Sequence, residues 1–425
     1  MSDAGRRWMG EVEVGAPLRP SSPLPSSPRR YGHARVLVRL HGLPLGFVET
    51  PLAPAGLDRD QLAGRIWTLF SGPIQAHLRK DGLEAPVSLG AEGIPSPARC
   101  GAARAISRRR PLSVVVCSHD RPRLLAQALA RLRELDHDHF EVLVVDSAPS
   151  TEDALDAFHR LAAGDSRFRY LREEAPGLSR ARNRGLTDAA FDHVAFTDDD
   201  VLPDSGWLTG VARGLATRPD VGCVTGLVLP ARLDTPAQRY FDGRTWWSSS
   251  LEPHVYSMSR PGGESGLFPF DTGRIGTGAN FTVDRRLMLE LGGFDERLGA
   301  GSATRGGEDL DAFHRILWAG RAIAYEPSAM VWHLHRPEPD QLRAQMHAYG
   351  MGLGAYGVKH LADPRKTVPV LSRLPMGARH LVTLWARPEA SWAGRGPLIL
   401  AELTGVARGP LAYLRAGRAR APRRP

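Results

Sequence analysis

Short apolar stretches alternate with amphipathic segments between residues 112 and 197, and this alternation constrains the fold more than any other feature. The run 112–117 is rich in β-branched residues, as is typical of a strand buried on both faces. Segment 121–135 repeats leucine and alanine at helical spacing. The other predicted strands are 140–145, 168–171 and 193–197, and the other predicted helices are 152–163 and 178–190. Strands alternating with helices predict an α/β fold, with a Rossmann-like, doubly wound and mainly parallel sheet.

Polar residues follow three of these strands. Cys117–Asp120 follows the first strand, Asp146 and Ser147 end the second, and the run 198–200 ends the strand at 193–197. Ligands of such sheets bind beyond the carboxyl ends of the strands. We therefore expect these groups to share one binding edge.

Three consecutive carboxylates, Asp198, Asp199 and Asp200, end the last of these strands. Adjacent acids repel one another, but a divalent cation would offset that repulsion. Carboxylate oxygens suit Mg²⁺ or Mn²⁺, and Mg²⁺ commonly bridges carboxylates to phosphate oxygens. The alternative is a solvated acidic turn or an Asx turn that caps the next helix. The position at a shared strand edge favours the metal and a diphosphate-bearing substrate.

Further candidates for nucleotide contacts lie near this edge. Asp146 can accept a hydrogen bond from a ribose hydroxyl or a base N–H, or it can cap a turn. At the start of the helix 178–190, Arg182 or Asn183 could face an anionic diphosphate while Arg184 points to solvent. A solvated helix face is the alternative for any one of these arginines.

A second set of candidates lies downstream. A glycine-rich loop, 299–307, leads into Glu308 and Asp309 at the start of a predicted helix. Acids in a first helical turn can simply complement the helix dipole. The long glycine lead-in favours delivery of an acid to a pocket, where it could act as a general base. His333 and His335 alternate along a predicted strand and so share one face, where a neutral imidazole could join carboxylates in binding Mn²⁺.

Eight segments in order resemble the family 2 glycosyltransferases, which have the GT-A fold. The resemblance covers residues 112–336, about half of the chain. The segments are SVVVCSHDRP, EVLVVDSAPS, GLSRARNRGL, AFTDDDVLP, GTGANF, GGFDE, GGEDLD and EPSAMVWHLHR. The resemblance implies inverting transfer of a hexose from a nucleotide-diphosphate sugar to a hydroxyl of a glycan, a lipid-linked acceptor or a small molecule, as in the synthesis of cell-envelope polysaccharides. The QXXRW signature and the membrane helices of processive synthases do not occur in the sequence, which favours single addition.

The resemblance also implies roles for individual residues. Asp309 matches the catalytic base, and Glu308 would support it or contact the acceptor. The acidic run resembles the DXD motif, but either Asp199 or Asp200 could be the metal ligand beside Asp198. The implied metal ligands are Asp198, Asp199, Asp200 and His333. The implied nucleotide contacts are Cys117, Ser118, His119, Asp146 (to the base edge), Arg182, Asn183, Asp198, Asp199 and Asn280.

Two other functions were weighed against this one. A sugar nucleotidyltransferase would want a glycine-rich phosphate loop with a basic residue after the first strand, whereas residues 117–121 contain no glycine. A non-catalytic nucleotide-sugar-binding protein would not need Asp309 together with the acidic run.

The flanking regions are less informative. The expected organisation is a disordered tail (1–30), a small α/β appendage (31–90) with a strand at 35–40 and a helix at 58–80, a linker (91–110), the GT-A catalytic domain (111–337) and a helical extension with a basic tail (338–425). The segment 230–270, with Trp246, Trp247, Tyr256 and Phe268, is expected either to bind the acceptor or to form a small aromatic core. An apolar stripe on 341–361 is expected to pack on the catalytic domain.

Composition narrows the setting and the partners. The net charge of +9 is concentrated at the chain ends, but aromatic residues are not interleaved with the basic clusters, which argues against a nucleic-acid partner. Three scattered cysteines, no signal-like N-terminus and no long apolar run suggest a cytoplasmic protein. The basic end from Leu398 could touch the inner face of a membrane.

Overall fold

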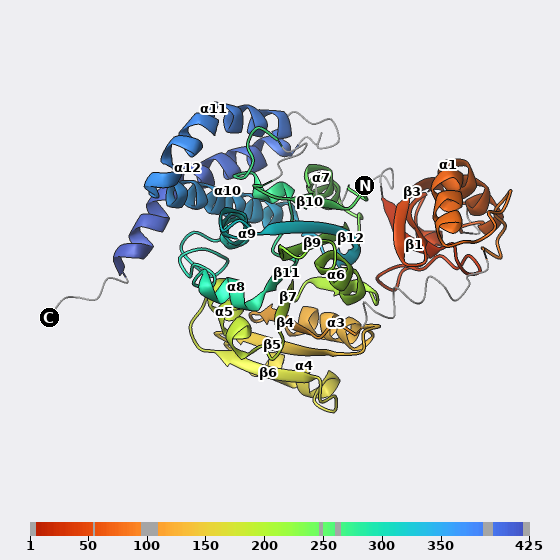
Figure 1. Ribbon diagram of the computed structural model, residues 1–425, viewed down its shortest axis with the longest axis horizontal. Helices are drawn as coiled ribbons and strands as arrows, with labels where there is room; N and C mark the ends of the chain where they lie inside the picture. The colour runs from red at the N-terminus through yellow and green to blue at the C-terminus, as the bar shows by residue number, and fades with distance from the viewer. Residues whose placement is uncertain are drawn as a thin grey trace.

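The computed structural model describes residues 6–53, 56–94, 109–245, 250–259, 265–385 and 394–419. An N-terminal module, a central α/β part and a group of C-terminal helices follow one another along the chain (Figure 1).

A nine-stranded sheet forms the centre of the molecule. Its strands are β4 (Leu112–Ser118), β5 (Phe140–Ser147), β6 (Phe168–Glu173), β7 (His193–Asp198), β8 (Val201–Pro203), β9 (Val221–Pro230), β10 (His254–Tyr256), β11 (Asn280–Asp284) and β12 (Ala322–His333). They lie in the order β10-β12-β9-β11-β7-β4-β5-β6, with β8 beside β12. The four strands predicted between residues 112 and 197 form the parallel half, β6-β5-β4-β7, which confirms the predicted fold class.

The other half of the sheet is mixed. Strand β11 runs antiparallel to both β7 and β9, whereas β9 and β12 are parallel. In this register Asn280, at the start of β11, pairs with Thr197, at the end of β7. The loop that precedes β11 therefore meets the carboxyl ends of the parallel strands, and this brings two segments about 80 residues apart to one edge.

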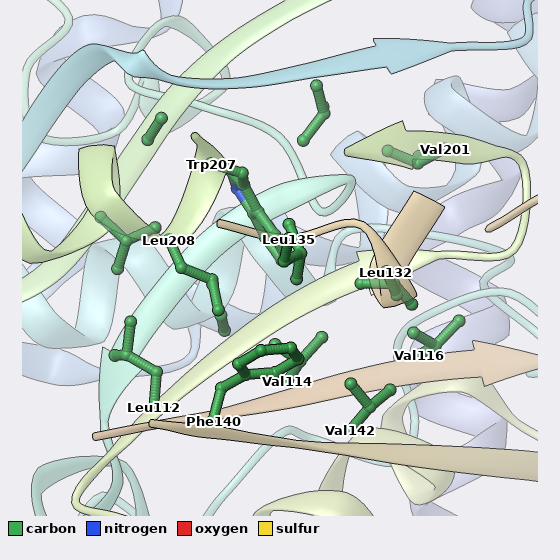
Figure 2. Close-up of a cluster of buried hydrophobic side chains, with 14 of the residues drawn as sticks. Leu112, Val114, Val116, Leu132, Leu135, Phe140, Val142, Val201, Trp207 and Leu208 are labelled. Carbon is green, nitrogen blue, oxygen red and sulfur yellow. The ribbon is translucent and has the colours of Figure 1, made fainter. Parts of the chain in front are cut away.

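Successive strand residues point to opposite faces of the sheet, so its apolar strands present apolar side chains on both faces. Helices cover both of these faces. Val114, Val116 and Val142 face α3 (Pro122–Arg133), α4 (Asp153–Leu161) and α6 (Trp207–Leu215). Figure 2 shows this core, in which Leu132, Leu135 and Trp207 lie over strand side chains that include Val114 and Phe140. The opposite face, with Val115 and Leu143, is covered by α5 (Leu178–Asp188), α8 (Arg285–Glu290) and α9 (Glu308–Trp318).

The N-terminal module is a three-stranded sheet with one helix. It contains β1 (Arg7–Glu13), β2 (His33–Leu40), β3 (Leu43–Pro51) and α1 (Arg59–Lys80), around its own buried core. The strand and helix predicted at 35–40 and 58–80 are present as β2 and α1. The prediction of a disordered tail over 1–30 is wrong for residues 6–30, because β1 pairs with β2 along its whole length and both Val14 and Leu18 are fully buried.

The module also includes the first residues of the expected linker. Leu18 N–H donates to Ala91 O, and Ile94 N–H donates to Val14 O, both at 2.8 Å. Residues 91–94 therefore belong to the module rather than to a linker, and 95–108 lie outside the described residues.

Three helices form the C-terminal extension: α10 (Pro339–Leu361), α11 (Pro364–Trp385) and α12 (Arg395–Ala419). Glycines let α10 and α12 approach closely, since a Cβ on Gly350 would stand 2.1 Å from Glu402 O. The Arg244 side chain, at the end of α7 (Pro236–Arg244), pairs with Glu402 at 2.8 Å and joins the extension to the central part. No helix in the described ranges is long and apolar enough to cross a membrane.

Candidate active site

A cavity of about 510 Å³ opens at the carboxyl ends of β4 and β7. It is lined by ten of the residues singled out in the sequence: Cys117, Ser118, His119, Arg182, Asp198, Asp199, Asp200, Glu308, Asp309 and His333. The sheet register explains this convergence, because Cys117 pairs with Asp198 and Ser118 with Asp146 at the ends of adjacent strands.

The three aspartates of the acidic run have different surroundings. Asp199 is anchored, accepting from Ser118 Oγ at 2.9 Å and from Arg121 Nη1 at 3.0 Å. Its side chain is 4% exposed, whereas that of Asp198 is 27% exposed and receives one long contact, 3.3 Å, from Arg182 Nη2. Asp198 is therefore the more accessible of these two carboxylates to a ligand in the cavity.

Asp200 lies between two arginines and a histidine. Its Oδ2 accepts from Arg121 Nη1 at 3.1 Å and from Arg336 Nη2 at 3.2 Å. Its Oδ1 stands 3.6 Å from His333 Nε2. His333 Nδ1 in turn lies 2.8 Å from Nδ1 of the buried His335, so that Nε2 is the ring nitrogen turned toward Asp200.

Burial shifts the pKa values of these groups. It raises the pKa of Asp198 to about 7, with Arg182 acting in the opposite direction, and the pKa of Asp199 to about 6. Burial lowers the pKa of His333, although the charge of Asp200 opposes that shift. The imidazole therefore stays neutral near pH 7, which is the form that binds metal ions.

Arg182 ties the two halves of the site together. It is 1% exposed, and its Nη1 donates to Glu308 Oε1 at 2.9 Å while its Nη2 donates to Gly278 O at 2.9 Å. With its contact to Asp198, the guanidinium joins the acidic run, the loop before β11 and the first turn of α9.

Asp309 is held by backbone N–H groups of the loop before β11 and of the first turn of α9. Its Oδ2 accepts from Gly278 N–H and its Oδ1 from Leu310 N–H, both at 2.8 Å. Glu308 instead turns toward Arg182, and burial, followed by the neighbouring charge of Asp309, raises the pKa of Glu308. The two adjacent acids are thus in different environments. Glu308 forms an ion pair with Arg182, whereas the hydrogen bonds described for Asp309 come from backbone N–H groups and not from a charged side chain.

The end of the cavity near β5 carries the groups expected at a nucleotide. His119 Nδ1 lies 2.6 Å from Ser147 O. Asp146, directly behind Ser147, is fully buried and accepts from Tyr170 Oη, while its Oδ1 has no hydrogen-bond partner among the described residues. Burial raises the pKa of Asp146, and burial also raises the pKa of the Cys117 thiol to about 12, so Cys117 is a neutral wall of the cavity.

Residues 113–262 match the family model for glycosyl transferase family 2. The chain contains a family 2 glycosyltransferase domain. The mixed sheet with helices on both faces is the GT-A fold of this family, as the sequence motifs predict.

Relatives of this glycosyltransferase domain extend the comparison. A pre-mycofactocin glycosyltransferase of Mycobacterium tuberculosis is 30% identical over 196 residues, which are 46% of this chain and 37% of the relative's length. The succinoglycan biosynthesis protein ExoM of Rhizobium meliloti is 29% identical over 239 residues, 54% of this chain and 67% of that protein. Among solved structures, a mannosyltransferase from Pyrobaculum calidifontis, in complex with GDP-Man and Mn²⁺, is 21% identical with a TM-score of 0.45, over 76% of this chain and 89% of that one.

Three residues expected to contact the nucleotide do not line the cavity: Asp146, which is fully buried, Asn183 and Asn280. The two asparagine amides are bound elsewhere. The Asn183 amide is paired with the backbone of Phe294, at 2.9 Å to its carbonyl and 2.7 Å to its N–H. Asn280 is 1% exposed and donates to Leu227 O and Ala329 O while it accepts from Trp207 Nε1. Both predictions are wrong because these amides satisfy backbone and indole groups inside the domain.

Two groups of residues that line the cavity were not predicted from the sequence. Arg121, Arg305 and Arg336 bring positive charge to the cavity, and Gln345, Tyr349 and Leu353 of α10 form one of its walls. Arg121 and Arg336 lie within two of the segments that carry the family resemblance, so their position was a usable signal. Tyr349 and Leu353 belong to the apolar stripe expected to pack on the catalytic domain, and with Gln345 they show that the C-terminal extension helps to build the cavity.

Proposed function

We propose that the domain, with residues 111–337 as its catalytic unit, transfers a sugar from a nucleotide-diphosphate sugar to a hydroxyl, with inversion and one sugar at a time. The observation that carries this proposal is the position of Asp309 in the same cavity as the Asp198–Asp200 carboxylates and His333. Such a transfer needs a base for the acceptor hydroxyl and compensation for the charge on the leaving diphosphate, and the two groups would supply them.

The chemistry of the donor set suits a divalent cation, Mn²⁺ or Mg²⁺, although the ligand atoms are not all within 4.8 Å of one another in this structure and would draw together on binding. We assign Asp198, Asp200 Oδ1 and His333 Nε2 as its ligands, because Asp199 is already bound to Ser118 and Arg121. Carboxylates with a neutral imidazole are suitable ligands for Mn²⁺. When bound, the cation would supply Lewis-acid stabilisation of the leaving diphosphate.

The donor would lie along the ends of β4 and β5. Asp146 lies behind the cavity lining, and its Oδ1, which has no hydrogen-bond partner among the described residues, would accept from a base N–H after Ser147 and His119 move aside. Arg305 and Arg336 would attract the diphosphate, since guanidinium groups match phosphate oxygens well. Ser118 holds Asp199, so its role is to position the acidic run.

The reaction would be a single displacement, the counterpart of inverting glycoside hydrolysis. Asp309 would take the proton of the attacking hydroxyl as the new glycosidic bond forms and the bond to the diphosphate breaks. The two backbone N–H groups fix the direction of the carboxylate, while Glu308 and Arg182 hold the start of α9 in place.

The acceptor side would include α10, because Tyr349 offers an aromatic face and an hydroxyl beside the cavity. Trp246 and Trp247, expected near the acceptor, lie outside the described residues. A lipid-linked acceptor is favoured by α11, where Val368, Leu371 and Val382 are at least half exposed. If this face touches a membrane, the protein should co-sediment with anionic vesicles and not with zwitterionic ones.

The replacement Asp309→Asn tests the proposed base. The donor is first identified as the UDP-, GDP- or dTDP-sugar that raises the melting temperature in the presence of Mn²⁺. The variant should release nucleotide diphosphate roughly 10² to 10⁴ times more slowly, because the hydroxyl loses its base. It should still bind the donor, and the exposed Glu290→Gln should change neither quantity. Unchanged turnover in Asp309→Asn would rule out the assigned role.

A further inference from the structure

Two imidazoles and a carboxylate converge in the N-terminal module, far along the chain from the cavity. His41 Nδ1 and His77 Nε2 are 2.9 Å apart. Asp81 Oδ2 lies 3.1 Å from His77 Nε2 and 3.7 Å from His41 Nδ1. Within the described ranges, this is the one cluster in which at least three His, Cys, Asp or Glu ligand atoms all lie within 4.8 Å of one another.

Two rigid elements hold these side chains together. His41 and Gly42 form the two-residue turn between β2 and β3, with φ of 54° and 80°, the left-handed pair that tight hairpins require. Glu13 fixes this turn by accepting from His41 N–H at 2.8 Å and from Gly42 N–H at 2.9 Å. His77 and Asp81 lie one turn apart at the end of α1, and therefore on one side of it.

The geometry matches three ligands of one tetrahedral ion. Metal bonds of 2.0–2.1 Å, as in zinc sites, place neighbouring ligand atoms about 3.3 Å apart. The three observed separations, 2.9, 3.1 and 3.7 Å, lie around that value. A single shared proton cannot satisfy all three atoms at once, whereas a cation at their centre can.

The chemistry of the trio also selects the ion. Imidazole nitrogen suits Zn²⁺ and related transition metals, whereas Mg²⁺ and Ca²⁺ prefer oxygen ligands. Burial lowers the pKa of His77, which keeps its ring in the neutral form that a metal needs, although the charge of Asp81 acts against this shift. The side chains of His41, His77 and Asp81 are 6%, 18% and 20% exposed, so the position is sheltered yet open to solvent.

We propose that His41, His77 and Asp81 bind a Zn²⁺ ion, with water in the fourth position, and that this ion clips the β2–β3 turn to the end of α1. The site is separate from the cation of the glycosyltransferase cavity. Its role is to stabilise the module, because binding energy at a site that forms only in the folded chain adds to folding stability.

The test uses the full chain with all three assigned cavity ligands replaced (Asp198→Asn, Asp200→Asn and His333→Gln), so that metal uptake by the proposed cavity site is removed. After treatment with a chelator, this protein should take up one equivalent of Zn²⁺ and its melting temperature should rise, whereas Mg²⁺ should have no effect. Losing a group that only hydrogen-bonds to a metal ligand weakens metal binding roughly 10- to 100-fold. Adding His77→Gln or Asp81→Asn, which remove a ligand, should weaken Zn²⁺ binding by at least that much.

His33→Gln is the matched control, since His33 is an exposed histidine on β2 of the same module. It should leave Zn²⁺ uptake unchanged. A second measurement replaces Zn²⁺ by Co²⁺ in the protein that carries only the cavity substitutions, so it does not depend on whether the ligand variants fold. Tetrahedral Co²⁺ absorbs visible light far more strongly than six-coordinate Co²⁺. Absence of Zn²⁺ uptake, weak Co²⁺ absorption, or full binding by folded His77→Gln and Asp81→Asn would each overturn the proposal.

Discussion

At the scale of single residues, the acidic run shows how neighbouring side chains of one type are given different tasks. Asp199 is fixed by Ser118 and Arg121, whereas the side chain of Asp198 is the most exposed of the three. Burial and the neighbouring carboxylates raise the pKa of Asp198 to about 7 and that of Asp199 to about 6, so these two acids are partly protonated near neutral pH. A cation entering the site therefore has to displace protons, which links metal binding to pH.

We predict that Mn²⁺ binds more tightly as the pH rises from 5.5 to 7.5. The pKa of Asp198 is raised to about 7, so below that pH the cation competes with a bound proton. The same shift makes the folded, metal-free protein bind more protons than the unfolded chain between pH 4 and 7, so its stability should fall as the pH rises through 7. Calorimetric titration of Mn²⁺ across this range measures the first effect.

Asp198→Asn is the control for this prediction. It should weaken Mn²⁺ binding at pH 7.5 and flatten the pH dependence, because the titrating carboxyl is gone. A Kd that does not change between pH 5.5 and 7.5 in the original chain would contradict the prediction.

The residues that were predicted correctly and those that were not differ in a physical way. Asp198–Asp200 could be placed from the sequence because they directly follow a strand, and strand ends of a parallel sheet share an edge. Asn280 also stands at a strand end, but its direction is set by Trp207 and by carbonyl groups of β9 and β12, which are distant in sequence. A motif therefore identified the position of Asn280 but not the side to which its amide turns.

At the scale of helices and strands, α10 shapes the active site by close packing. Gly352 of α10 lies against the loop that delivers Asp309, and a Cβ at Gly352 would stand 2.6 Å from Gly306 C and 2.7 Å from Gly307 N. Gly307 itself has φ of 89°, a conformation that side chains disfavour. The position of the proposed base therefore depends on the backbone of a helix outside the predicted catalytic unit.

We predict that Gly352→Ala lowers the rate of transfer by roughly 100-fold, since displacement of a catalytic group by about 1 Å can have an effect of this size. Gly357→Ala, on the same helix, is the matched control, because a Cβ there meets nothing within 4 Å. The control should keep full activity and gain up to about 1 kcal/mol of stability from the better helix propensity of alanine. Steady-state kinetics and urea unfolding of both variants separate the two effects, and equal activities would exclude the proposed dependence.

The same scale explains which elements the sequence revealed. Strands β4, β5 and β7 contain continuous apolar runs, and their type can be recognised from local pattern alone. Strand β1 is a short segment in a region rich in proline, serine and arginine, and it becomes ordered only by pairing with β2. Composition therefore gave the wrong answer for residues 6–30, because the stabilising contacts come from the next part of the chain.

At the scale of the whole molecule, the N-terminal module is docked on the glycosyltransferase domain (Figure 1). Met9 and Leu37 of the module share a buried cluster with Leu229, Met330 and Trp332 of the central sheet. Beside this cluster, Arg39 forms a two-pronged ion pair with Asp204, with distances of 2.7 and 3.0 Å. Both side chains are largely buried, at 13% and 6% exposure, so the pair is shielded from water and salt.

We predict that Asp204→Ala destabilises the protein by roughly 1–3 kcal/mol, because the buried Arg39 loses its two-pronged partner and keeps only its pair with Glu11, at 2.9 Å. Asp220→Ala is the matched control, since its pair with Arg218 is 28% and 35% exposed and should contribute less than about 1 kcal/mol. Urea unfolding measures both changes. Combining Asp204→Ala with Arg39→Met should restore part of the loss, with a coupling of about 0.5–3 kcal/mol, because the buried positive charge is then removed together with its partner. If the two substitutions were simply additive, the ion pair would not hold the module in place, and docking would rest on the apolar cluster alone.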